Sequence, residues 1–300
     1  MKTFISLSAL FLSLSLTAQT NTATWYLNDT SGNGIQSSSN TASGSFSVAM
    51  GIGTTASGKY STAMGVETTA SGKRSTAMGE GTIASGDFST AKGRNTIASG
   101  YHSTVMGLFA EASGDTSTAM GHQTEASGQF SIAMGSYTEA SGDYSTAMGD
   151  YTEASGNVST ALGRDTTASG NYSTAMGYKT TASGGTSTAM GVATNAEDYI
   201  SFAIGSFNET DENSNPYQFS FQNTAFVIGN GGFDSNGNFL GLNGPRSNAF
   251  EVLFDGTTTI AGDLNVNSDA RLKANIVSLG ATLTKLLQID GKSYTMKKDE

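Results

Sequence analysis

The chain has 300 residues, a formal net charge of −10 and no cysteine. The absence of cysteine excludes a disulfide framework and a lipid-attachment cysteine, and the acidic balance argues against nucleic-acid binding, which favours a basic surface. Stability is therefore expected to come from internal repetition and from association of chains.

The first residues have the composition of a secretory signal peptide. Lys2 precedes an apolar run from Phe4 to Leu16, and Ala18 offers a small residue for cleavage. We expect residues 1–18 to be removed on export and residues 19–40 to form a short lead-in. No other apolar stretch is long enough for a membrane-spanning helix, so the predicted location is extracellular or at the cell surface.

Residues 41–205 are an internal repeat with a period of fourteen. Glycines recur in two series, and each series has this period. The second series, from Gly51 to Gly205, lies halfway between the glycines of the first series, so the chain turns about once every seven residues. We expect tight turns with positive φ at these glycines, because a residue without Cβ adopts that conformation without strain. The first series closes the tripeptide Ala-Ser-Gly at Gly44, Gly58, Gly72, Gly86, Gly100, Gly114, Gly128, Gly142, Gly156, Gly170 and Gly184.

Each period is predicted to form one flattened coil of an all-β parallel solenoid. Residues 61–65 and 68–72 illustrate the two extended segments of a coil, in which alternate side chains point to opposite faces. Ser61 and Ala63 share one face of the first segment, and Thr68 has the equivalent place in the second. In nearly every period these columns hold only Ser, Thr, Ala and Gly, so the inside of the coil is too narrow for Leu or Phe.

The opposite face of the first segment carries nine of the eleven methionines of the chain in one column. Such a ridge would leave a continuous apolar surface exposed, so it requires a partner surface. Packing is favoured over soft-metal binding, because no His or Cys accompanies the methionines. The column comprises Met50, Met64, Met78, Lys92, Met106, Met120, Met134, Met148, Leu162, Met176, Met190 and Ile204.

The outer face of the second segment varies between Thr69, Ile83 and Glu111 and is expected to see solvent. The turn positions after each glycine vary more, as at Lys73-Arg74 and Asp143-Tyr144. Specificity for a ligand would reside in these turns.

The alternation S-x-A-x-G and T-x-A-x-G at period fourteen resembles the head domain of trimeric autotransporter adhesins (YadA-like), over about Thr41 to Gly205. The resemblance implies a left-handed parallel β-roll that forms homotrimers. It also implies that Met50, Met64, Met78, Met106, Met120, Met134, Met148, Leu162, Met176 and Met190 face the trimer axis. That family usually carries Ile or Val there, so methionine is a departure, and Lys92 would be either an ion or water site or a tolerated defect.

The period fails after Gly205, and residues 206–267 are predicted to form an irregular β-rich connector. A loop from Asn208 to Pro216 should precede strands near 219–228 and 250–254. Between them, Asp234, Asn236 and Asn238 imitate half of a calcium loop. A hairpin closed by the Asn236-Gly237 turn is favoured over a calcium site.

The segment from Ser268 to Ile276 reads as the capped start of an amphipathic helix. Its sequence S-D-x-R-L-K-x-N-I resembles the start of the intramolecular chaperone domain of endosialidase-type phage tailspikes, which assists trimer assembly and then cleaves itself with a Ser-Lys dyad. The resemblance implies that Ser268 attacks the Asn267–Ser268 bond and that Lys273 is its base. Because residues 268–300 match only the start of that domain, we expect little or no cleavage within this sequence.

These features predict a secreted, homotrimeric adhesive fibre that binds a surface, a glycan or a protein receptor and needs no cofactor or metal. A phage-derived tail-fibre-like protein fits the same features. Ice or crystal-surface binding is an alternative from another class, because one threonine recurs in most periods. That column is predicted to be internal, and it comprises Thr54, Thr68, Thr82, Thr96, Thr124, Thr138, Thr152, Thr166, Thr180 and Thr194.

Overall fold

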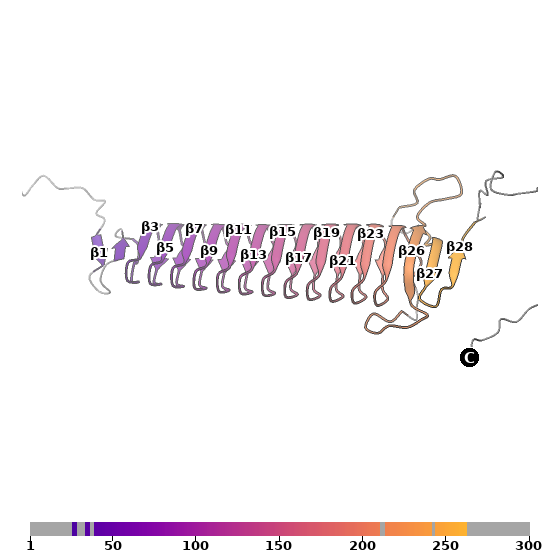
Figure 1. The fold of residues 1–300 in the computed structure, drawn as a ribbon. Helices are drawn as coiled ribbons and strands as arrows, with labels where there is room; N and C mark the ends of the chain where they lie inside the picture. Colours follow the sequence, from indigo (N-terminus) through magenta and orange to yellow (C-terminus); the bar gives the residue numbers. More distant parts are fainter. Residues whose placement is uncertain (1–25, 29–33, 37–38, 211–213, 242–243, 263–300) are drawn as a thin grey trace, which may run out of the picture. The chain divides into compact units, whose positions relative to one another are not determined.

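The structure, a computed structural model, describes residues 26–28, 34–36, 39–210, 214–241 and 244–262. They form a parallel β-solenoid in which each fourteen-residue coil adds one strand to each of two sheets (Figure 1). No helix occurs within these ranges. The predicted all-β solenoid is confirmed, whereas the helical segment expected in residues 268–300 lies outside the described residues.

The first sheet contains the longer strands. Neighbouring strands pair in parallel with a constant offset of one coil, so that Met64 lies opposite Met78. The repeat strands of this sheet are β3 (Val48–Ile52), β5 (Thr62–Val66), β7 (Thr76–Glu80), β9 (Thr90–Arg94), β11 (Thr104–Leu108), β13 (Thr118–His122), β15 (Ile132–Ser136), β17 (Thr146–Asp150), β19 (Thr160–Arg164), β21 (Thr174–Tyr178), β23 (Thr188–Val192) and β25 (Phe202–Ser206).

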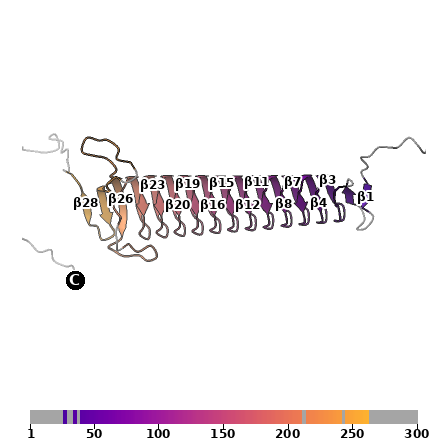
Figure 2. The same ribbon diagram turned by 180° about the vertical axis from the view of Figure 1, so that it is seen from behind.

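The second sheet contains two-residue strands in the same register, with Thr69 opposite Ile83 (Figure 2). Its strands are β4 (Thr55–Ala56), β6 (Thr69–Ala70), β8 (Ile83–Ala84), β10 (Ile97–Ala98), β12 (Glu111–Ala112), β14 (Glu125–Ala126), β16 (Glu139–Ala140), β18 (Glu153–Ala154), β20 (Thr167–Ala168), β22 (Thr181–Ala182) and β24 (Asn195–Ala196).

The interior of each coil is filled by small side chains. Ala63 and Ala70 face each other from the two sheets at 0% exposure, and Ser61 and Thr68 are equally buried. The predicted inward columns are confirmed, and the recurrent threonine column is internal. Some serine hydroxyls bond locally, as Ser75 Oγ donates to the Gly72 carbonyl at 2.7 Å, whereas the Thr68 hydroxyl has no hydrogen-bond partner among the described residues.

The Ala-Ser-Gly glycines are required by close approach and not by positive φ. Gly58 and its equivalents lie outside the left-handed region, so the expectation of positive φ at these positions was wrong. A Cβ added at Gly58 would overlap the Gly72 carbonyl oxygen of the next coil. The midway series does have positive φ, and Gly65 (φ 126°) meets Gly79 in the same way.

Non-glycine residues adopt the left-handed conformation at two turns of most coils, and Gly53 and Gly81 take the second of these positions in two others. Tyr60 has φ 62° and Glu67 has φ 54°, values that are uncommon for residues with a side chain. Hydrogen bonds between coils hold them there, because Tyr60 N donates to Ser45 O at 2.9 Å and Glu67 N donates to Ile52 O at 2.8 Å. The stacking of coils therefore offsets the local strain.

Additional strands extend the first sheet beyond both ends of the repeat. Strands β1 (Tyr26–Asn28) and β2 (Gly34–Gln36) form an antiparallel pair, and β2 joins β3 in parallel. At the other end β26 (Thr224–Asn230) continues the parallel sheet after β25, and β27 (Asn248–Leu253) and β28 (Thr258–Ile260) add to it antiparallel. These strands pair edges that would otherwise be open to other chains.

The predicted hairpin at residues 233–239 is present, with an antiparallel bridge between Phe233 and Phe239. Asp234 accepts hydrogen bonds from the backbone of Asn236 at 2.9 Å and of Asn238 at 2.8 Å. The Asn238 side chain adds a third hydrogen bond, and it is the main cause that holds the pKa of Asp234 below its ordinary value. This carboxylate serves the turn, as the hairpin interpretation predicts.

Replacing an Ala-Ser-Gly glycine tests the close contact between coils. Gly128→Ala should lower the free energy of unfolding by about 3 kcal/mol, because the new Cβ overlaps the Gly142 carbonyl and the backbones must separate. Denaturant unfolding followed by circular dichroism measures the loss. The exposed neighbour Gln129→Ala should change the stability little, and equal effects of the two substitutions would contradict the role of the contact.

Candidate assembly interface and surface columns

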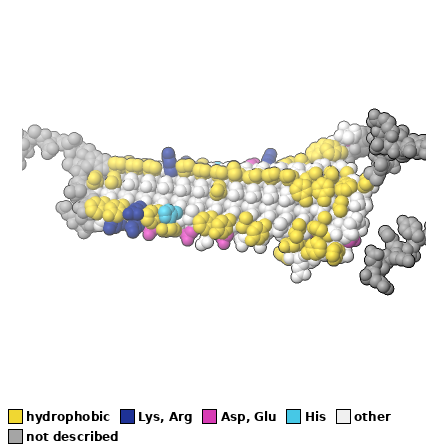
Figure 3. Space-filling view, viewed as in Figure 1, with side chains coloured by type: hydrophobic (Ala, Val, Ile, Leu, Met, Phe, Trp, Pro, Cys, Tyr) yellow, Lys and Arg dark blue, Asp and Glu magenta, His cyan; other side chains and the backbone are white. Residues whose placement is uncertain are grey.

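The methionine column lies on the outer face of the first sheet. Its side chains are partly exposed, and Met106 and Met148 reach 40% and 37% exposure. Strand register places each member directly opposite its equivalent in the next coil, from Met50 to Ile204. Figure 3 shows hydrophobic side chains in rows that run along the stacked coils. The chain by itself therefore leaves an apolar ridge uncovered.

The ridge extends further than the repeat. Strand β26 aligns Phe226 with Phe202 and Ile228 with Ile204, although the step between them is longer than one period. The sequence analysis missed Ile228 as a member of the column. The pattern Phe226-Val227-Ile228-Gly229, which repeats the x-A-x-G alternation with larger residues, could have indicated it.

A threonine column stands beside the methionines on the same outer face. Thr62 and the other threonines of this column are half-buried, in contrast to the internal Thr68 column. The sequence analysis did not single them out, although the alternation in S-T-A-M-G places this threonine on the side of the methionine. The column comprises Val48, Thr62, Thr76, Thr90, Thr104, Thr118, Ile132, Thr146, Thr160, Thr174, Thr188 and Phe202.

Lys92 interrupts the methionine column and is exposed. Strand register places it between Met78 and Met106. Within the described part of the chain no carboxylate lies at salt-bridge distance from its ammonium group, whereas the nearby Arg94 pairs with Glu80 at 3.5 Å. A partner surface that covered the ridge would therefore bury an unpaired charge at this level.

Aromatic side chains form stacked pairs at several of the turns that follow the Ala-Ser-Gly triplets. Ring centroids lie 5.3 Å apart for Phe46 and Tyr60, and 4.9 Å apart for Phe130 and Tyr144. Arg74 lies over the Tyr60 ring at 5.8 Å. In Figure 3 hydrophobic, basic and histidine side chains alternate along the lower edge of the roll. His102 stacks on Phe88 in this column, whereas His122 lies against Tyr137, which stacks on Tyr151 at the midway turns.

The outer face of the second sheet carries four glutamates in neighbouring strands. Register places Glu111, Glu125, Glu139 and Glu153 in one line. Like charges in directly opposed positions repel each other, and water screens them at this exposed surface. The expectation that this face sees solvent agrees with its burial pattern.

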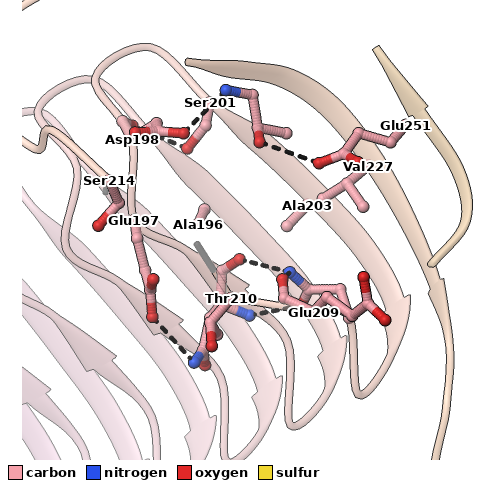
Figure 4. Close-up of a pocket in the computed structure, with 13 residues that line it drawn as sticks. Ala196, Glu197, Asp198, Ser201, Ala203, Glu209, Thr210, Ser214, Val227 and Glu251 are labelled. Atoms are coloured by element: carbon pink, nitrogen blue, oxygen red, sulfur yellow. Dashed lines mark hydrogen bonds between the residues drawn. The ribbon is translucent and has the colours of Figure 1, made fainter. Parts of the chain in front are cut away.

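The end of the roll contains a small polar cavity of about 20 Å³ (Figure 4). Asp198, which replaces the glycine of an Ala-Ser-Gly triplet, is 3% exposed and accepts hydrogen bonds from Asn215 N and Thr224 N, both at 2.8 Å. The Thr224 hydroxyl donates to Glu251 at 3.2 Å. A cavity of this size holds about one water molecule and is too small for a larger ligand. Its side chains therefore have a structural role and hold the connector against the last coil.

Comparison with protein families identifies the repeat. A model described as the YadA head domain repeat, two copies long, matches residues 42–68, 70–96, 98–124, 112–138, 126–152, 140–166, 154–180 and 182–208, which together cover more than half of the chain. The chain belongs to the YadA head-repeat family. A second model, described as the chaperone of endosialidase, matches residues 268–300. A comparison with curated proteins finds no match.

The predicted site residues of this YadA-type roll fall into two groups. The ten residues predicted to face a trimer axis, from Met50 to Met190, lie in register in one column on the outer face. Ser268 and Lys273, which fall in the segment similar to the endosialidase chaperone, lie outside the described residues. No helix in the described part of the chain is long and apolar enough to cross a membrane.

Completing the methionine column should stabilise the assembled YadA-type protein. Lys92→Met removes a charge that a partner would have to bury without a counter-charge. We expect a gain of more than about 1 kcal/mol per chain, or about 2–4 °C in the thermal midpoint. Differential scanning calorimetry measures the change. Arg94→Met, beside it on the same strand, should give no such gain, and an unchanged or lower midpoint for Lys92→Met would contradict burial of the column.

Proposed function

We propose that the protein is the head of a homotrimeric adhesive fibre, in which the methionine columns of three chains meet at a common axis. The observation that carries the proposal is the uncovered ridge from Met50 to Ile228. Each such side chain contributes roughly 1.5–3 kcal/mol when it is fully buried. The summed free energy of burying a row of these side chains can exceed the entropy cost of association.

The shape of the ridge favours cyclic closure over flat face-to-face packing. The methionine column is one side chain wide and is flanked by the Thr62 column, whose threonines are half-buried. Around a symmetry axis, equivalent residues of each chain meet at the same height, so each methionine would contact its own equivalents. The YadA head repeat supports three chains as the number.

Adhesion is assigned to the surfaces that this arrangement leaves free. The aromatic and charged turns around Tyr60, Arg74 and Tyr144 are exposed and vary from coil to coil. Variable loops on a rigid scaffold are where binding specificity usually resides. The receptor is a surface, a glycan or a protein, and export through the signal peptide at residues 1–18 would bring the fibre to it.

The oligomeric state tests this proposal directly. Light scattering on residues 41–205 should report three chains. Met120→Asp combined with Met134→Asp should dissociate or unfold the assembly, because the carboxylates would be buried unpaired, whereas Glu125→Lys on the second sheet should leave three chains. A stable, soluble monomer of the unaltered segment would rule the proposal out.

We also propose that residues 268–300 belong to an assembly chaperone that removes itself after the trimer has formed. Ser268 Oγ would attack the carbonyl carbon of Asn267, and Lys273 would take the hydroxyl proton and pass it to the leaving Ser268 amine. Water would then hydrolyse the resulting ester and leave Asn267 with a free carboxylate. A lysine serves as base when burial or neighbouring groups keep it neutral. Support comes from the spacing of the two residues and from the chaperone-family match.

Cleavage is tested on protein expressed to the natural end of its reading frame. Mass spectrometry should find a new N-terminus at Ser268 after assembly, and both Ser268→Ala and Lys273→Ala should leave the chain whole. If the unaltered trimer stays intact for days, the segment acts as a folding cap alone.

Two alternatives differ in their support. The endosialidase-chaperone match also fits a phage-derived tail-fibre-like protein, which would share the trimeric architecture. Ice binding would require the recurrent threonine column to point outward. Thr68, Thr138 and their equivalents are instead buried inside the coils.

A further inference from the structure

A cavity of about 440 Å³ lies where the connector folds back against the last coils of the repeat. Three tyrosines line it, Tyr172, Tyr199 and Tyr217, together with Asn171 and Thr186. None of the described residues that line it is charged. Its volume is within the range of about 300–1,000 Å³ that is usual for small-molecule sites.

The cavity exists because the repeat is broken at one position. In earlier coils the residue after the Ala-Ser-Gly glycine often carries a side chain that bonds back to the preceding coil, as Asn171 Oδ1 accepts from Asn157 N at 3.0 Å. The next residue in this column is Gly185, which has no side chain. The space that the side chain fills in earlier coils is therefore empty. A Cβ at Gly185 would come within 3.0 Å of the Tyr199 ring, so any larger residue would crowd the cavity.

The far wall is fixed by hydrogen bonds within the chain. Gly185 N donates to Pro216 O at 2.8 Å, and Tyr199 N donates to Asn215 O at 3.0 Å. The buried carboxylate of Asp198 holds the same segment through Asn215 N at 2.8 Å. The cavity is therefore formed before any ligand arrives, which reduces the ordering cost of binding.

One aromatic face is left open toward this space. Elsewhere in the same column the rings cover one another, as Phe130 covers Tyr144. None of the described rings stacks on Tyr172, which is 64% exposed and is followed in the column by Thr186. Its π face, which carries partial negative charge, remains available to a ligand.

We propose that this cavity binds one neutral sugar ring of a glycan, an inference that rests on the proposed adhesive function and gives its receptor a chemical class. The C–H groups on one face of a pyranose carry partial positive charge and complement the Tyr172 ring. Its hydroxyl groups match the amide of Asn171 and the hydroxyls of Ser183 and Thr186, which both donate and accept hydrogen bonds. The uncharged lining disfavours acidic sugars and phosphate.

A proline-rich peptide is the other ligand that aromatic grooves bind. Such a peptide needs an extended groove, whereas the hydrogen bonds of Gly185 and Tyr199 to residues 215–216 close this cavity on one side. The geometry therefore favours a compact ring over an extended chain.

Saturation-transfer NMR on the full chain tests the site with the methyl glycosides of glucose, galactose, mannose and N-acetylglucosamine. At least one should receive saturation with a dissociation constant in the millimolar range. Tyr172→Ala should weaken that binding about tenfold. Tyr137→Ala, which removes an exposed tyrosine at a midway turn away from the cavity, should leave it unchanged.

Three outcomes would overturn the inference: no transfer to any of the four sugars, equal binding by the Tyr172→Ala protein, or displacement of the sugar by a polyproline peptide. Light scattering on the same samples tests the trimer separately. A trimer that binds no sugar would contradict the sugar site and leave the proposed trimer standing.

Discussion

The whole structure depends on the contact between the backbones of successive coils at two columns of glycine. At Gly58 and Gly65 the next coil approaches so closely that a single added carbon would overlap a carbonyl oxygen. This contact fixes the distance between coils and keeps every column in register. It also explains why residues with side chains tolerate a left-handed conformation at the turns, because the inter-coil hydrogen bonds of Tyr60 and Glu67 hold the backbone in that conformation.

Close coils leave little room for a conventional core. Ala63 and Ala70 fill the interior with little apolar area each, and a buried hydroxyl such as that of Thr68 without a partner costs free energy. The larger apolar side chains therefore stand outside, on the face that carries Met64. In the proposed trimer, the larger hydrophobic core would lie between chains, and the fold of the monomer would be linked to its assembly.

The sequence predicted the coil, the inward columns and the outward methionines because all of them follow from one period and from the alternation of a strand. It failed where the cause was not periodic. The close approach at Gly58 is invisible in a sequence, because glycine in a repeat indicates equally a positive φ or a tight contact. Strand β26 rejoins the sheet after an irregular step, so Ile228 escaped notice. The cavity beside Tyr172 depends on a segment anchored by Asp198, a contact between residues that no pattern connects.

The constant register has a consequence for how such a molecule changes over generations. Each repeat strand contacts only strands of its own coil and of the coils before and after it, and Met120 lies between the levels of Met106 and Met134. Duplication or loss of one complete fourteen-residue unit would therefore leave every remaining contact in place and alter only the reach of the fibre. Copy number, more than substitution, is the variable that sets the length of this architecture.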